Sequence, residues 1–201
     1  GYTVSSTDLN TRMFRFANRP EARQWLPLYD KGLILRHLTE GALTGMEDVL
    51  DYFLGETEVE QSDIAGISTG TSMSFFEIHM AFLLGRRIRE LTGKPVVFGG
   101  ANLDYLWQFR EAFQELWLAI FRNFEYLFIG PGERSFAGLI SGLVQAEGAS
   151  PYRKLPGAVY WENGQVVRNP EDAPTLIRPD FRGLDLKFHT LSCRAGQPLW
   201  E

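Results

Sequence analysis

Apolar residues in the middle of the chain occur as short runs, and each run is followed by a loop of small residues. Such runs, when turn residues bound them, are typical of strands buried in a parallel sheet. Three of them predict strands at residues 63–68, 95–98 and 126–129.

A stretch with helical spacing follows each predicted strand. Residues 75–92 place apolar side chains on one broad face, and Gly93 is a typical helix end. A long helix is expected at 103–122, and a final helix runs from the third loop to about Gln145. Strand, loop and helix in threefold succession predict an α/β fold with a parallel sheet and right-handed crossovers.

The N-terminal part carries weaker patterns. Residues 2–8 alternate loosely between polar and apolar types and predict a strand. Helical spacing is expected at 11–16 and again at 33–54, where residues 41–45 interrupt it.

The pattern changes again after residue 150. Asn163 and Gly164 lie between two strand-like segments, which predicts a β-hairpin. Residues 169–185 are rich in proline and charge and predict an extended arm. We therefore expect an α/β domain over residues 1–150, followed by a hairpin and linker arm over residues 151–201.

Composition narrows the functional classes. The chain has 201 residues, of which 44% are hydrophobic, enough for a buried core of one domain. A formal net charge of −5 argues against a nucleic-acid binder. The single cysteine, Cys193, excludes a disulfide framework and a Cys-rich zinc site. No apolar run approaches about 18 residues and no signal peptide is visible, so we expect no membrane partner and a reducing cytoplasm.

The small-residue loops are the main candidates for binding chemistry. All three leave the carboxyl ends of predicted parallel strands, so they converge on the edge where α/β sheets bind ligands. Their glycines let a ligand approach the backbone, and Ser68, Thr69, Thr71 and Ser72 add hydroxyl groups. None of the loops has the glycine pattern of a dinucleotide site or a P-loop. The alternative, purely structural interpretation is that each loop is only a tight turn after a strand.

The histidines and the cysteine offer little catalytic chemistry. His37 and His79 have no second histidine at a metal-binding spacing, and His189 and Cys193 are four residues apart without further partners. Glu133 starts a predicted helix, where its charge is favourable. No residue is a convincing catalytic acid, base or nucleophile, and no metal site is predicted.

Several segments together resemble a known family. These are Asp-Ile-Ala-Gly-Ile-Ser-Thr (63–69), Pro-Val-Val-Phe-Gly-Gly-Ala (95–101), Glu-Tyr-Leu-Phe-Ile-Gly-Pro-Gly-Glu (125–133) and Leu-Pro-Gly-Ala-Val-Tyr (155–160). In order and spacing they resemble the cobalamin-binding domain of cobalamin-dependent radical S-adenosylmethionine enzymes, and the hairpin resembles the arm leading into the radical barrel. The resemblance covers most of the chain, to about residue 186.

The resemblance implies a flavodoxin-like, doubly wound, Rossmann-like parallel sheet that holds the nucleotide tail of cobalamin at its carboxyl edge. It implies a radical S-adenosylmethionine barrel as partner, in cis or in trans. Carried over to this sequence, it assigns cofactor binding to Ser68, Thr69, Gly70, Thr71, Ser72, Gly99, Gly100, Ala101, Gly130, Pro131, Gly132 and Glu133.

The chain departs from the family in three ways. The family's first strand and helix are missing before Gly1, which would leave the sheet gapped. The Asp-x-His-x-x-Gly motif for a lower axial histidine is absent, and so is the cysteine cluster for a 4Fe-4S centre. The chain alone is therefore expected to be a binding domain, with the iron–sulfur cluster and S-adenosylmethionine confined to a parent enzyme, where methyl transfer is the expected reaction. The alternatives are a degenerate interaction module without cofactor and a small flavin- or nucleotide-binding protein.

Overall fold

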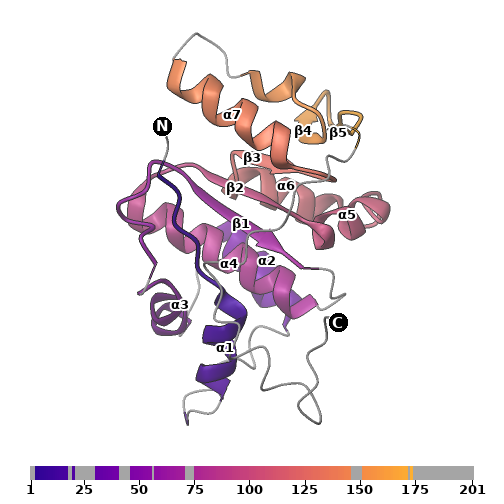
Figure 1. Ribbon diagram of the computed structural model, residues 1–201. Helices are drawn as coiled ribbons and strands as arrows, with labels where there is room; N and C mark the ends of the chain where they lie inside the picture. Colours follow the sequence, from indigo (N-terminus) through magenta and orange to yellow (C-terminus); the bar gives the residue numbers. More distant parts are fainter. Residues whose placement is uncertain are drawn as a thin grey trace, which may run out of the picture.

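The strands form one mixed sheet. The computed structural model describes residues 3–17, 20, 30–40, 46–55, 57–70, 75–145, 151–171 and 173. Within them the strand order is β1 (Ala65–Thr69), β2 (Val96–Gly100), β3 (Tyr126–Phe128), β4 (Ala158–Glu162) and β5 (Gln165–Arg168). The first three strands are parallel, and β4 and β5 are antiparallel (Figure 1). The predicted α/β class is confirmed.

Helices cover both faces of this sheet unequally. The lower layer in Figure 1 contains α1 (Leu9–Ala17), α2 (Lys31–Glu40), α3 (Glu47–Leu54), α4 (Phe75–Thr92), α5 (Ala101–Gln108) and α6 (Gln114–Asn123). The opposite face carries α7 (Glu133–Gln145) and a 3₁₀ turn, Pro151–Lys154. Alternation along the strands serves both layers, because Phe98 points into the larger core and its neighbour Val97 into the smaller one.

Aromatic rings bind the sheet to the larger helical layer. The rings of Phe82, Phe98 and Phe124 lie with centroids 5.4–5.9 Å apart, and all three are buried. Gly85 of α4 permits this packing, since a Cβ there would overlap the Phe124 ring. The helical face predicted for residues 75–92 therefore packs on β2 and α6.

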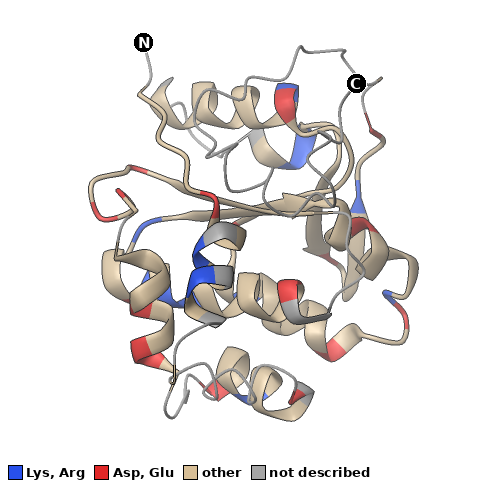
Figure 2. Ribbon diagram, turned by 60° about the horizontal axis from the view of Figure 1, so that its bottom comes forward, with Lys and Arg blue, Asp and Glu red and all other residues tan. Residues whose placement is uncertain are grey.

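Charged residues outside the core are interspersed by sign in the described part of the chain (Figure 2). Arg87 of α4 donates to both carboxylate oxygens of Asp51 at 2.7 and 2.8 Å, and this hydrogen bonding lowers the pKa of Asp51. Arg89 pairs with Glu125 at 2.8 Å. These pairs tie α4 to α3 and to the segment before β3.

The hairpin prediction is confirmed. Asn163 and Gly164 have φ of 49° and 80°, the left-handed values that a tight two-residue turn requires. β4 also pairs with β3, with Leu127 opposite Val159, so the hairpin extends the same sheet rather than standing apart from it. The arm predicted beyond it falls mostly outside the described residues.

A buried tyrosine, Tyr152, stabilises the pairing of β3 with β4 through hydrogen bonds. The Tyr152 hydroxyl accepts a hydrogen bond from the backbone N–H of Leu127 at 2.8 Å and lies against the carbonyl oxygens of Leu127 and Val159. Burial raises the pKa of Tyr152 well above its usual value, so the hydroxyl stays protonated and able to donate.

The strand predicted at 2–8 is wrong for the residues that are described. Residues 3–8 have no regular secondary structure, and residues 3–7 are exposed. Loose alternation indicates a strand only where a neighbouring strand pairs with it and one face is buried, and neither condition holds here.

The long helix predicted at 103–122 is also wrong. The chain forms α5 and α6, separated by a turn in which Phe109 and Arg110 donate to carbonyls three residues earlier. Trp107 and Trp117 explain the break, because ten residues of straight helix would separate them by about 15 Å along the axis. The turn brings their rings to 6.2 Å.

The winding of the sheet is simpler than expected. Strands β1 to β5 lie side by side in chain order, so the order of the described strands does not reverse across the sheet as it does in a doubly wound fold. The described residues contain no strand on the outer edge of β1, where Gly66 and Ser68 are exposed. What the structure establishes is a mixed α/β sheet with three parallel strands.

Candidate functional site

The three predicted loops do share one edge of the sheet. Ser68 and Thr69 at the end of β1 lie opposite Gly99 and Gly100 at the end of β2, and Gly130 follows β3. Parallel strands place their carboxyl ends together, and this edge is where open α/β sheets bind ligands.

Gly100 serves the chain's own packing. Its φ is 102°, and a Cβ there would lie 2.6 Å from the backbone nitrogen of Thr69. Thr69 is buried and donates its hydroxyl to the Gly99 carbonyl at 3.2 Å. This glycine and this hydroxyl are therefore used to join the ends of β1 and β2.

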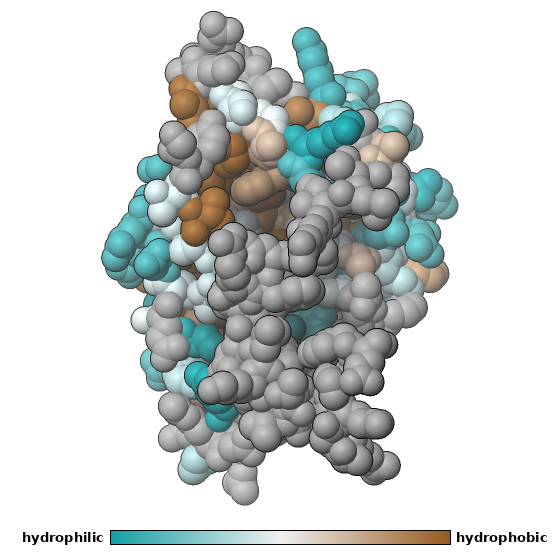
Figure 3. All heavy atoms as spheres, in the orientation of Figure 1, coloured by the Kyte–Doolittle hydropathy of each residue, from teal (hydrophilic) through white to brown (hydrophobic). Residues whose placement is uncertain are grey.

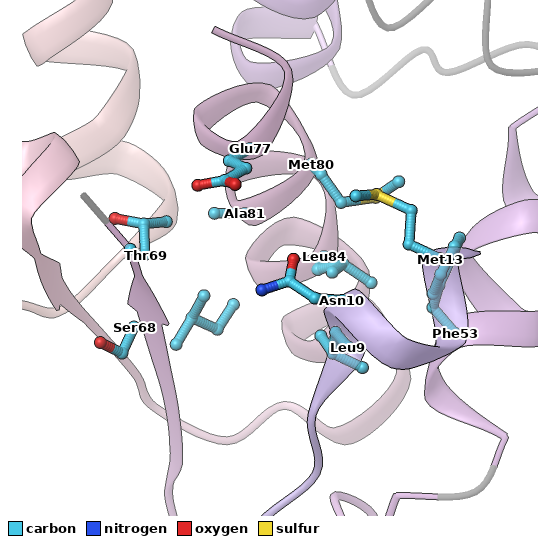
Figure 4. A pocket seen from close by; sticks show the side chains of 12 residues that line it. Leu9, Asn10, Met13, Phe53, Ser68, Thr69, Glu77, Met80, Ala81 and Leu84 are labelled. Carbon is cyan, nitrogen blue, oxygen red and sulfur yellow. The ribbon is translucent and has the colours of Figure 1, made fainter. Parts of the chain in front are cut away.

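A small cavity lies beside the end of β1. Its volume is about 80 Å³, and among the predicted residues Ser68, Thr69 and Gly70 line it (Figure 4). The other walls come from α1, α3, α4 and β1, namely Leu9, Asn10, Met13, Phe53, Ile67, Glu77, Met80, Ala81 and Leu84. Most of these side chains are apolar, and Asn10, Ser68, Thr69 and Glu77 are the polar residues of the lining.

A polar contact missed by sequence reasoning links two of the loops. The buried Asn102 side chain, in the first turn of α5, donates to Glu77 of α4 at 3.2 Å. Glu77 also approaches Gly70, where a Cβ would lie 3.8 Å from its carboxylate. The signal was present in the sequence, since both residues begin a helix that follows a small-residue loop.

The loop after β3 lies apart from this cavity. Gly130 has φ of 85°, and the Glu171 side chain lies directly over it. The loop enters α7 through a bond from Phe136 N–H to the Gly132 carbonyl at 2.7 Å. Glu133 is exposed in the first turn of α7, which matches the favourable charge position expected for it.

Arg168 was not predicted, yet it connects the loop after β3 to the helix after β2. It lies at the end of β5, pairs with Glu171 and contacts Asp104 of α5 at 3.4 Å. Its guanidinium carbon lies 5.7 Å from the centre of the Trp107 ring, and 15% of the side chain is exposed. Nothing in the spacing of these residues along the chain indicates their proximity.

The predicted site residues therefore fall into separate places. Ser68, Thr69 and Gly70 border the cavity, while Gly99, Gly100 and Ala101 adjoin it without lining it. Gly130, Pro131 and Gly132 form the loop before α7, and Glu133 is the first residue of that helix. Thr71 and Ser72 lie outside the described residues.

Two of the three histidines lie within the described residues. His37 and His79 are both buried in helices, α2 and α4. Both ring nitrogens of His37 are buried without a hydrogen-bond partner, and burial lowers its pKa. His189 and Cys193 lie outside the described residues. The described part of the chain contains no cluster of three or more His, Cys, Asp or Glu side chains suited to a metal ion.

Comparison with known proteins gives no relative for this chain. No protein-family model, curated protein or solved structure matches it. In the described segments, no helix combines the length and apolar character needed to cross a membrane.

The carboxyl edge offers polar partners for a ligand, but its cavity is small. Hydroxyl groups, backbone amides and glycines are suitable partners for amide and phosphate groups. Ligand pockets usually have volumes of about 300–1,000 Å³, whereas the cavity holds about 80 Å³. A ligand of ordinary size would require the walls of the cavity, such as α1, to move aside.

Proposed function

We propose that this chain is the cobalamin-binding domain of a cobalamin-dependent radical S-adenosylmethionine enzyme. One observation carries the proposal: three parallel strands end in small-residue loops on one edge, in the order that the family resemblance requires. Under this proposal the sheet is the described part of a doubly wound, flavodoxin-like domain, and the radical barrel is its partner in a reducing cytoplasm.

The residues would divide the work of binding. The backbone of Ser68 and Gly70 presents polar groups beside the cavity, while Ile67, Met80 and Leu84 line it with apolar side chains. Ala101 is exposed and adds little bulk, whereas a Cβ on Gly99 would lie 3.2 Å from the Phe128 carbonyl oxygen, so this strand end is closely packed. When bound, cobalamin would supply the cobalt that carries a methyl group, and the chain's own task would be to hold and orient it.

Titration with hydroxocobalamin tests this proposal, with gel filtration to separate free cofactor. Bound corrinoid that elutes with the folded protein, and much weaker binding of tail-free cobinamide, is the expected result. Absence of binding by folded protein would overturn it.

Two glycine variants on the same strand region sharpen the test. Gly70→Val places a side chain at the cavity rim, and its nearest contact would be Glu77 at 3.8 Å, so the fold should tolerate it. Gly66→Val points into open space away from the cavity and is the matched control. We expect Gly70→Val to weaken corrinoid binding about tenfold or more and Gly66→Val to change it less than about twofold.

A second candidate function is an interaction module that binds no corrinoid. The large apolar side chains Phe136, Leu143 and Val144 are exposed on α7, and Val144 is 65% exposed. Figure 3 shows hydrophobic side chains gathered in the upper part of the visible face, where Figure 1 places α7 and the adjoining sheet. Folded protein that binds no corrinoid but loses self-association or partner binding on Val144→Asp would favour this candidate.

A further inference from the structure

The Glu171 side chain fills the space beside Gly130 that a side chain at position 130 would otherwise occupy. A Cβ on Gly130 would overlap the Glu171 carboxylate and lie 2.8 Å from its Cγ. Gly130 follows the carboxyl end of β3 and precedes α7, whose N-terminus is the positive end of the helix dipole. An anionic group of the chain therefore lies where a ligand would meet the third loop.

Arg168 provides the positive partner in this slot. Its Nη2 pairs with Glu171, whereas its Nη1 contacts Asp104 at 3.4 Å. The face of Trp107 supports the guanidinium at 5.7 Å. Because Asp104 and Trp107 hold Arg168 independently of Glu171, the nitrogen that pairs with Glu171 would stay in place if Glu171 left.

The segment carrying Glu171 is anchored without its side chain. Asn169 N–H donates to the Ala158 carbonyl at 2.9 Å, and Gly157 N–H donates to the Pro170 carbonyl at 3.0 Å. The Asn169 side chain adds bonds of 2.8 Å to the carbonyls of Arg153 and Leu155. Glu171 is 41% exposed, so its side chain can turn into solvent while the backbone stays fixed.

We propose that Arg168 and the Gly130 loop form a binding site for a ligand phosphate, and that Glu171 holds the place of that phosphate when no ligand is bound. A partly exposed ion pair contributes little to stability, so a phosphate that accepts a charge-assisted hydrogen bond from Nη2 of Arg168 can displace Glu171. The phosphodiester of a nucleotide tail is the ligand group that the proposed function would bring here, so the identity of the ligand rests on that function. The phosphate site itself does not.

Inorganic phosphate is the probe that tests the phosphate site separately from the corrinoid-binding function. The assigned amide signal of Gly130 in ¹⁵N NMR spectra is the readout. Glu171→Gln keeps the shape of the side chain and removes its charge, and we expect phosphate to bind this variant about tenfold more tightly than the parent chain. Glu171→Gln combined with Arg168→Gln should lose the gain. Arg153→Gln in the same background removes a cation that is 61% exposed and pairs with Glu162, so it is the matched control and should keep the gain.

The amide signals of Gly157 and Asn169 report whether each variant keeps its hairpin folded. No phosphate-dependent shift of Gly130 in folded Glu171→Gln protein, or an equal gain with and without Arg168, would overturn the site. If phosphate binds at Gly130 but the protein does not bind hydroxocobalamin, the phosphate site is supported and the corrinoid-binding function is overturned. Corrinoid binding that Glu171→Gln leaves unchanged would overturn the assignment of the nucleotide-tail phosphate to this site.

Discussion

The two halves of the carboxyl edge differ, although their loops look alike in the sequence. At the β1–β2 half, Gly100 lets two strand ends meet, and a cavity remains beside Ser68, Thr69 and Gly70. At the β3 half, Gly130 makes room for a charged side chain from the hairpin arm. A glycine-rich loop can thus serve backbone packing in one place and leave space for an anion in the next. Only the spatial neighbours of each glycine distinguish the two roles.

The largest expected loss of stability comes from a substitution at the β1–β2 half of the edge. Gly100→Ala combines a positive φ with overlap against the backbone of Thr69, so we expect a loss of roughly 4 kcal/mol in the free energy of unfolding. Gly132→Ala, in the loop of the β3 half, meets nothing within 4 Å and should change stability by less than about 1 kcal/mol. Urea unfolding measures both, and equal losses would contradict the different roles of the two loops.

The next effect concerns the anchoring of the β3 half. Tyr152→Phe removes a hydroxyl that serves the buried backbone groups of Leu127 and Val159, so we expect a loss of about 2 kcal/mol. Tyr160→Phe removes a 3.3 Å contact of a half-buried hydroxyl with Asn169 and should cost less than about 1 kcal/mol. A Tyr152→Phe variant as stable as Tyr160→Phe would show that β3 and β4 do not depend on this bond.

The helical layer beneath the β1–β2 half should respond to acid through His37. Burial lowers its pKa in the folded chain, against opposing effects of Glu90 and Glu47 and a reinforcing effect of Arg86. The unfolded chain therefore binds more protons as the pH falls below about 6.5, and the free energy of unfolding decreases by up to about 1.4 kcal/mol per pH unit until the folded histidine also titrates.

Replacement by an apolar residue isolates this contribution. His37→Leu should remove most of the pH dependence between about pH 6.5 and 5, as measured by urea unfolding at each pH. His37→Leu protein with the same pH slope as the parent chain would assign that slope to other groups.

The smallest effect involves the ion pair between Arg87 and Asp51. The pKa of Asp51 is lowered in the folded chain, so its contribution is present above about pH 4 and disappears as the pH falls through the lowered value. The carboxylate is 45% exposed, and we expect Asp51→Asn to cost about 0.5 kcal/mol or less at neutral pH. A loss comparable to that of Tyr152→Phe would mean that α3 depends on this pair far more than its exposure suggests.

The sequence correctly predicted the elements that are determined by interactions between residues close together in the chain. The helix at 75–92 has its predicted bounds, and Gly93 ends it with φ of 66°. The Asn163-Gly164 turn likewise follows from backbone preferences of those two residues. Each of these elements is encoded by neighbours in the chain.

Elements that depend on distant partners were missed. The break between α5 and α6 requires the pairing of Trp107 with Trp117, which no helical spacing indicates. Residues 3–8 alternate in polarity, but no strand in the described part of the chain pairs with them, so they form no strand. The Arg168–Glu171 slot over Gly130 was hidden for the same reason, because the hairpin folds back across the loop after β3.

The most direct test is to map hydroxocobalamin binding onto the assigned ¹⁵N amide spectrum of the whole chain. If the carboxyl edge binds a corrinoid, we expect signal shifts at both of its halves, in Gly70 and Gly99 at one half and in Gly130 at the other, with Val144 on α7 unaffected. Shifts confined to α7, or no shifts in a folded protein at saturating hydroxocobalamin, would contradict the claim that this edge binds a corrinoid.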